Sequence, residues 1–469
     1  MASKLSQSDF TAWYRPNGFL ITLSEGIATL DPAGLKFDNE DGLSVAFHEY
    51  VHYLQNIATP SGFHSFKLAF ELWRLFRETV DEDGTSAGAG ALSATKQQSL
   101  DQYLDIFFAI EGDVEPDWSD DDFVASDFEI DRLNVVAEQR RLGNIQTEVT
   151  NVTLHGSALD AENGQSESYS FQLGATAISE GIAFELDQIV ASGQSGQRAP
   201  GDTAPPFPYH VLRKVAEREC PEIPVGGVLT LGCLSLLWND PAGELVHLFD
   251  LYNERVQAGA TPDEAVQQIV QLRLPDIRAL IRDILAVDIP AMENALQATG
   301  NFERGLIRIL GRFRQLLARR GAEPLLELSV LDDDGRISFA RTRDLLESIP
   351  ICMVMLERVG SENVLARDAL LSSEISLQPA RADDELALLY AAFDFCAVHQ
   401  WFDGLRPTDH VGEHCCPFYT CCTLRMRIEA PESCRTKPWV AATWTGWPED
   451  QTCWYGAAAK RLPAGTGAI

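Results

Sequence analysis

The sequence predicts a mostly helical α+β protein, and three observations lead to this class. Helical periodicity of apolar residues dominates from residue 209 to about 397. Residues 144–155 and 166–173 instead alternate with period two, which is typical of strands. The 45% hydrophobic and 9% aromatic content is enough for a sizeable core and argues against wholesale disorder.

The elements divide into three segments in chain order. The first is an N-terminal lobe at 1–195 with a small β-sheet, the second a helical lobe at 209–397, and the third an irregular Cys-rich tail at 398–469. A Pro- and Gly-rich linker at 193–208 separates the first two. In the N-terminal lobe the patterns predict hairpins over 17–31 and 144–173, and helices over 41–57, 64–80, about 93–110 and 174–191.

His48-Glu49-Tyr50-Val51-His52 lies on the first of these helices and fits the pattern H-E-x-x-H. Because four residues make about one helical turn, both imidazoles project from one face and can reach a single ion. Glu49 then lies beside the ion, where it can take a proton from a metal-activated water. The alternative is an ordinary amphipathic helix that carries two polar histidines.

A hydrolytic zinc site needs a third protein ligand, and Glu180 supplies one. It stands in the first half of the expected helix 174–191, within Glu180-Gly181-Ile182-Ala183-Phe184. This element resembles the Glu-Gly-Phe-Ala-x-Tyr element of aminopeptidase N-type enzymes, in the gluzincin class of zinc metallopeptidases. In that class two parallel helices carry the H-E-x-x-H pair and the glutamate.

The resemblance implies a zincin-like N-terminal lobe that binds Zn²⁺ and hydrolyses peptide bonds. By position it implies that the metal ligands are His48, His52 and Glu180 and that Glu49 is the general base. It also implies that Asp187 orients a ligating histidine. The donor that stabilises the oxyanion is left open among Tyr209, His210, His247 and Tyr252. Substrate is expected to add as a strand to one of the two predicted hairpins.

Three functions share this sequence pattern. The first is a zinc peptidase acting on a protein or peptide, the second a small-molecule amidase or other hydrolase with the same ligands. The third is a non-catalytic scaffold with a zinc-stabilised fold. A purely structural site has no need of a general base, so Glu49 argues against the scaffold. The helical lobe is a candidate surface for a regulatory protein partner.

Negative charge is concentrated in one segment. The chain has 69 acidic and 37 basic residues, a formal net charge of −32, which makes broad binding to nucleic acid or anionic membranes unfavourable. Between Glu78 and Asp131 there are 16 acidic residues and one lysine. This segment lies inside the stretch from His52 to Glu180, which is much longer than in the gluzincins. It is either a solvated, partly disordered insertion or an acidic rim that selects basic substrate segments.

The last part of the chain is rich in cysteine. Six of the ten cysteines fall between Cys415 and Cys453. Their spacing suits a second, structural metal held by Cys416, Cys421, Cys434 and Cys453. The alternative is that free cysteines simply pack as small hydrophobes.

The N-terminal residues lack the features of a secretory signal. The longest apolar stretch, 225–238, is too short to span the roughly 30 Å of a bilayer core. These observations predict a cytoplasmic protein.

Overall fold

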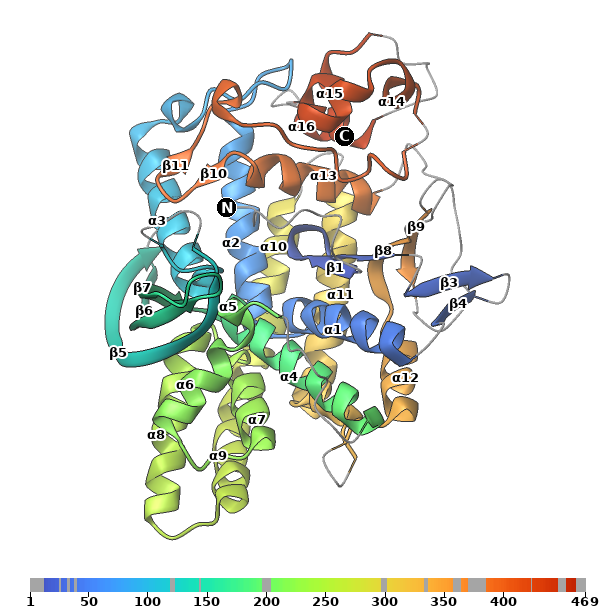
Figure 1. Ribbon diagram of the computed structural model, residues 1–469. Coiled ribbons are helices and arrows are strands. Elements are labelled where there is room, and N and C mark those ends of the chain that lie inside the picture. The colour runs from blue at the N-terminus through green and yellow to red at the C-terminus, as the bar shows by residue number, and fades with distance from the viewer. Residues whose placement is uncertain are drawn as a thin grey trace.

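The computed structural model describes residues 12–24, 27–31, 34–37, 40–118, 123–142, 145–195, 204–296, 302–332, 336–356, 364–369, 385–422, 424–445 and 453–460. Within these ranges the chain forms a mostly helical α+β protein with small sheets, as predicted (Figure 1). The described part of the chain contains no helix that is both long and apolar enough to cross a membrane.

The strands form several small sheets. The mixed sheet beside the candidate site has the order β1-β2-β8-β9, with β1 at one edge. Its strands are β1 Ala12–Arg15, β2 Leu20–Leu23, β8 Ile351–Leu356 and β9 Val364–Ala369. The others are β3 Ala28–Asp31 with β4 Gly34–Phe37, then β5 Ala125–Leu142, β6 Ile145–Asp160 and β7 Ser166–Leu173, then β10 Gln400–Trp401 with β11 Gly404–Leu405.

The hairpin predicted over 17–31 is wrong. The strands β2 and β3 both fall in this range, but they belong to different sheets. β2 pairs antiparallel with β1 and parallel with β8, which comes from far along the chain. Its four residues are fully buried, so the strand needs a partner on both sides.

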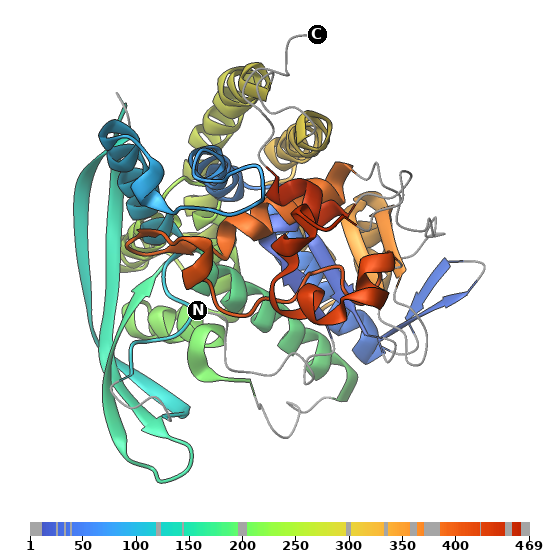
Figure 2. The same ribbon diagram turned by 90° about the horizontal axis from the view of Figure 1, so that it is seen from above.

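The hairpin predicted at 144–173 is confirmed as the antiparallel pair β6–β7. The sequence did not predict β5, which pairs with β6 along its length and forms a long curved outer strand (Figure 2). The register of β5 shifts between Ile130 and Arg132, so a β-bulge breaks the apolar alternation there. Val135 and Val136 of this strand are exposed.

All four helices predicted in the N-terminal lobe are present. They are α1 Glu40–Ile57, α2 Pro60–Arg77, α3 Ala94–Glu111 and α4 Ala175–Ser195. α2 begins four residues earlier than predicted, because Pro60 occupies its first position and the Thr59 side chain accepts the Gly62 amide at 3.0 Å. The acidic segment therefore contains the whole of α3 and the start of β5, while residues 119–122 lie outside the described ranges.

The rest of the chain is largely helical, as expected, but also supplies β8 and β9. The helices are α5 Pro206–Tyr209, α6 Val211–Glu219, α7 Val225–Ser235, α8 Pro241–Gln257, α9 Pro262–Asp283, α10 Ile289–Ala295, α11 Glu303–Ala322, α12 Phe339–Ser348, α13 Glu385–Ala397, α14 Arg425–Glu429, α15 Pro431–Thr436 and α16 Trp454–Ala459. Helices α6 to α9 extend at one end of the molecule, and the Cys-rich tail lies at the other, over α13 (Figure 1). The predicted linker falls partly outside the described residues, and the division into three segments stays a prediction.

Helices α1 and α4 pack against each other in the middle of the fold (Figure 1). The predicted apolar stripe of α1 is buried, including Phe47 and Val51. On the same helix Tyr50 donates to the Ile349 carbonyl oxygen at 3.1 Å, which ties α1 to the short connection between α12 and β8. On α4, a side chain at Gly181 would lie 2.5 Å from Leu212 Cβ, so glycine permits the close approach of α6.

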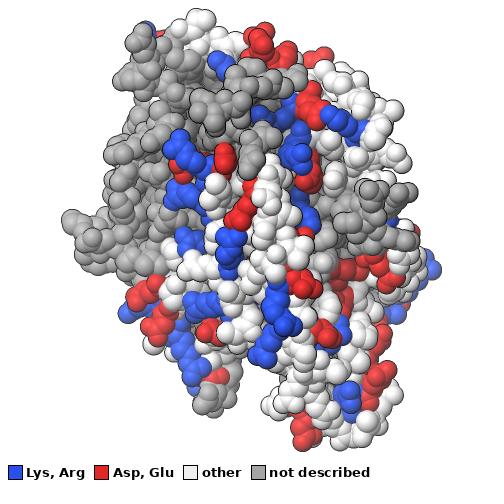
Figure 3. All heavy atoms as spheres, turned by 180° about the vertical axis from the view of Figure 1, so that it is seen from behind, with Lys and Arg blue, Asp and Glu red and all other residues white. Residues whose placement is uncertain are grey.

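Lys and Arg are interspersed with Asp and Glu on the face opposite that of Figure 1 (Figure 3). On the described surface that this view shows, positive side chains therefore lie close to negative ones. Arg314 and Glu293 form one of the ion pairs of the protein, at 2.9 Å.

Acid is expected to destabilise the protein through His399. Burial lowers the pKa of this fully buried imidazole to about 4. An unfolded histidine titrates near pH 6.5, so between pH 6.5 and 4 the unfolded state binds the extra proton. The free energy of unfolding therefore carries the full contribution of neutral His399 above about pH 6.5. That contribution, about 3 kcal/mol, is lost as the pH falls from 6.5 to 4. Urea unfolding of wild type and His399→Gln across this range should give a flatter stability profile for the variant; parallel profiles would contradict the assignment.

Candidate metal centre

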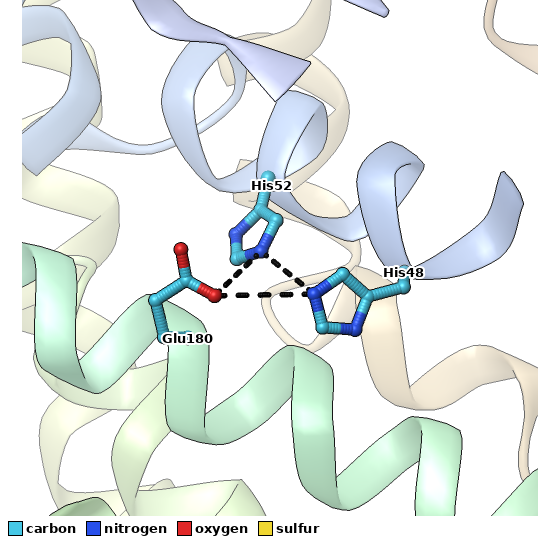
Figure 4. Close-up of side chains that lie close together, drawn as sticks. All are labelled: His48, His52 and Glu180. Atoms are coloured by element: carbon cyan, nitrogen blue, oxygen red, sulfur yellow. Dashed lines mark hydrogen bonds and ion pairs between the residues drawn. The ribbon is translucent and has the colours of Figure 1, made fainter. Parts of the chain in front are cut away.

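His48, His52 and Glu180 meet between α1 and α4 (Figure 4). The Nε2 atoms of the two histidines are 3.1 Å apart. Glu180 Oε2 lies 3.1 Å from His52 Nε2 and 3.9 Å from His48 Nε2. The one-turn spacing of the two histidines places both rings on the face of α1 that meets α4, as predicted.

These distances fit a zinc ion. Ligands at about 2.0–2.1 Å in tetrahedral geometry lie about 3.3 Å from one another, close to the three separations observed. Two imidazole nitrogens and one carboxylate are also the donor set of many hydrolytic zinc sites, which keep a fourth position open. Among the described residues, this is the one group that brings three candidate ligand atoms within 4.8 Å of one another.

The three side chains are electrostatically coupled. Burial alone would lower the pKa of His52, but the nearby Glu180 carboxylate raises it to about 9. The same contact holds the pKa of Glu180 below its usual value, although burial acts in the opposite direction. Burial, together with the charge of His52, lowers the pKa of His48 to about 4. The carboxylate is thus held in its charged form, which is the form that binds a metal.

Glu49 lies beside this group without belonging to it. Burial raises the pKa of Glu49 to about 7, and the negative charge of Glu180 acts in the same direction. The backbone amide of Tyr14 on β1 donates to its carboxylate. A carboxyl group that titrates near neutral pH can both accept and return a proton, as a general base must.

The orientation of the ligands depends on backbone and side-chain contacts around them. The His48 ring donates to the backbone carbonyl of Ala183 on α4, which leaves Nε2 directed at the site. Asp187 accepts a hydrogen bond from the Ser44 hydroxyl of α1. That contact joins the two helices one turn before His48 on α1 and two turns after Glu180 on α4. An orienting role of Asp187 towards a histidine stays a prediction.

A cavity of about 230 Å³ opens onto the candidate ligands. His48, Glu49, His52 and Glu180 line it from α1 and α4, and β1 lines it from the side. The indole nitrogen of Trp13 and the hydroxyl of Tyr14, both on β1, are buried polar atoms with no hydrogen-bond partner in the described part of the protein. Such atoms are costly to leave unpaired and suit contact with a bound molecule.

Of the four candidate oxyanion donors, one lines the cavity at the candidate ligands and three do not. Tyr209 lines the cavity, and its ring centroid lies 6.3 Å from that of His48. His210 packs instead on Phe184, with ring centroids 4.9 Å apart. His247 and Tyr252 do not line the cavity. The substrate edge was expected at one of the two predicted hairpins, but the described residues of 17–31 and 144–173 contribute no lining residue. The strand that lines the cavity is β1, which lies outside both predicted hairpins.

The cysteines of the tail form no comparable group. All ten cysteines are free thiols. Cys416, Cys421, Cys434 and Cys453 lie within the described ranges, yet no three of the candidate ligand atoms in this region come within 4.8 Å of one another. The Cys421 thiol donates to the Phe418 carbonyl oxygen at 3.5 Å, as a packed free cysteine does. A second metal at these four residues stays a prediction.

No family model, no curated protein and no solved structure matches this chain. The candidate metal centre therefore rests on its own geometry and on the short motifs that carry it.

Proposed function

We propose that the protein is a gluzincin-like zinc peptidase that hydrolyses peptide bonds of a protein or peptide substrate. The observation that carries this proposal is the position of Glu49. It lies in the wall of the same cavity as His48, His52 and Glu180, with its pKa raised by burial to about 7. A site that only stabilised the fold would need neither the cavity nor the base.

Zinc held by the three side chains would act as a Lewis acid and make a water molecule a stronger acid. Glu49 would accept the proton of the attacking water and return it to the leaving amine. The amide of Tyr14 orients the Glu49 carboxylate for both transfers. The edge of β1 would hold an extended substrate beside this carboxylate, because in the described part of the chain β1 pairs on one side only, with β2.

Tyr209 is the best-placed group to stabilise the negative charge on the substrate oxygen. Burial raises the pKa of its hydroxyl, as do the charges of Glu180 and Glu49. The hydroxyl is therefore a neutral donor at physiological pH, on the cavity wall beside His48. It would donate a hydrogen bond that strengthens as the oxygen becomes charged.

Tyr209→Phe is expected to lower kcat by about 100-fold, the usual cost of removing one oxyanion donor. Zinc content and KM should change little, because Tyr209 is not a ligand and the ring is retained. Steady-state kinetics on a cleaved peptide, with zinc measured on the same sample, checks this. Unchanged kcat would show that the donor is a different group.

The proposed activity is tested by incubating wild type and Glu49→Gln with a proteome-derived peptide library. Cleavage that depends on Glu49 is expected. Absence of any such cleavage would remove the peptidase proposal. Glu49-dependent hydrolysis of small amides alone would then favour the amidase, and zinc binding without either activity would favour the scaffold.

A further inference from the structure

A second cavity adjoins the first and shares part of its wall. It has a volume of about 70 Å³, and four phenylalanines line it, Phe19, Phe66, Phe107 and Phe393. Four further residues line both cavities, namely Pro16, Asn56, Ser65 and Glu111. The cleft at the candidate metal centre thus continues into an aromatic side pocket, and Glu111 stands where the two meet.

Glu111 is held in place from two sides. Its Oε1 atom accepts a hydrogen bond from the Ser65 hydroxyl of α2 at 2.5 Å, and its Oε2 atom accepts one from the Thr176 hydroxyl of α4 at 3.3 Å. Thr176 and Glu180 are one helical turn apart on α4, about 5–6 Å between Cβ atoms. The carboxylate of Glu111 therefore lies about one turn of α4 away from the third candidate ligand.

The partners of Glu111 in the described part of the chain are neutral. Burial raises its pKa, and among the described residues the two hydroxyl hydrogen bonds act in the opposite direction. Within the described ranges, no Lys, Arg or His pairs with it. Glu111 is half-buried, and a carboxylate that has lost much of its hydration is normally paired with a cation. Here the open space in front of it leaves room for that cation to come from a ligand.

We infer that Glu111 and the adjoining phenylalanine pocket form a subsite for a positively charged group of the substrate. The phenylalanine rings suit the aliphatic stem of a lysine or arginine side chain, and the carboxylate suits its charged head. This inference rests on the proposed function for its reaction, but the binding it describes does not require cleavage. It also gives one residue of the acidic segment, at the end of α3, a place in the substrate cleft.

The inference is tested by binding in the Glu49→Gln background, where cleavage of the peptide during the measurement is expected to be strongly slowed. The probes are two hexapeptides that differ only by arginine or citrulline, which have the same shape and differ in charge. The substituted position is moved along the peptide, and each probe is used with a free or an acetylated N-terminus. With Glu111 intact, isothermal titration should show about 10- to 100-fold tighter binding of the arginine peptide at one position.

Glu111→Gln should reduce that ratio to about one without weakening the citrulline peptide. The glutamine keeps an oxygen for the Ser65 hydroxyl, and thermal unfolding and zinc content establish that the variant is folded. Asp101→Asn, which removes an exposed charge from the same helix, is the matched control and should leave the ratio unchanged. In a second outcome, Glu111 favours peptides with a free N-terminus over acetylated ones, whether they carry arginine or citrulline. That result would support the subsite, with the α-ammonium group of the peptide as its cation.

The subsite is overturned if wild-type Glu111 gives no preference for either cation, or if Glu111→Gln retains the full preference. The proposed function fails by a different result. In that case the charge preference persists in binding, while no peptide is cleaved by the protein with Glu49 intact.

Discussion

Glu49→Gln is expected to lower kcat/KM for peptide hydrolysis by about 100- to 10,000-fold and to leave zinc bound. Glutamine matches the shape of glutamate and can still accept the Tyr14 amide, but it cannot take a proton. The loss should appear in kcat rather than KM, because Glu49 acts on the attacking water and not on the resting substrate. Kinetics on a peptide cleaved by wild type, with zinc determined on the same preparation, measures both quantities.

Two results would contradict this role. Retention of more than about a tenth of wild-type activity would mean that another group acts as the base. Loss of zinc together with activity would mean that Glu49 is needed to assemble the site. Glu49→Asp is a useful control, since it keeps the carboxylate but withdraws it by one methylene. It should fall between wild type and Glu49→Gln.

Glu180→Ala is expected to weaken zinc binding by more than about 100-fold. Mutation of a group that merely orients a ligand costs 10- to 100-fold, and loss of a ligand should cost more. The substitution also leaves His52 without the carboxylate at 3.1 Å that raises its pKa. His52 would then be neutral at physiological pH, so the loss of affinity would come from the missing ligand and not from protonation. Competition with a chelator, followed by metal analysis, measures the affinity.

Ser179→Ala is the matched control for this variant. Ser179 precedes Glu180 on α4 and lines the same cavity, but it is not among the candidate ligands. Its zinc affinity should equal that of wild type. Equal affinities for Glu180→Ala and wild type would instead remove Glu180 from the proposed metal centre.

The parts of the site that could be predicted from the sequence are those fixed within one helix. The spacing of His48 and His52 places them on one face whatever the tertiary fold, and the apolar stripe of α1 identifies the opposite face. Glu180 was predicted from a short element that determines its position on α4. The packing of α1 against α4 could be expected only because the sequence places predicted ligands of the same ion on both helices.

The remaining parts depend on contacts between distant segments. The parallel pairing of β2 with β8 brings β1 to the site, and no local pattern encodes a partner so far along the chain. Trp13 and Tyr14 therefore gave no signal of a role in the cleft. Glu111 was visible only as one of many acidic residues, because its significance comes from the hydroxyls of α2 and α4 that hold it.

We propose that His48, His52 and Glu180 together hold a zinc ion. Anomalous diffraction from crystals of the purified protein, recorded on both sides of the zinc absorption edge, tests this most directly. We predict one zinc peak between α1 and α4, about 2.0–2.2 Å from the two Nε2 atoms and from the Glu180 carboxylate. A zinc-replete crystal with no peak at this position, or with a peak only among the cysteines of the tail, would contradict the claim.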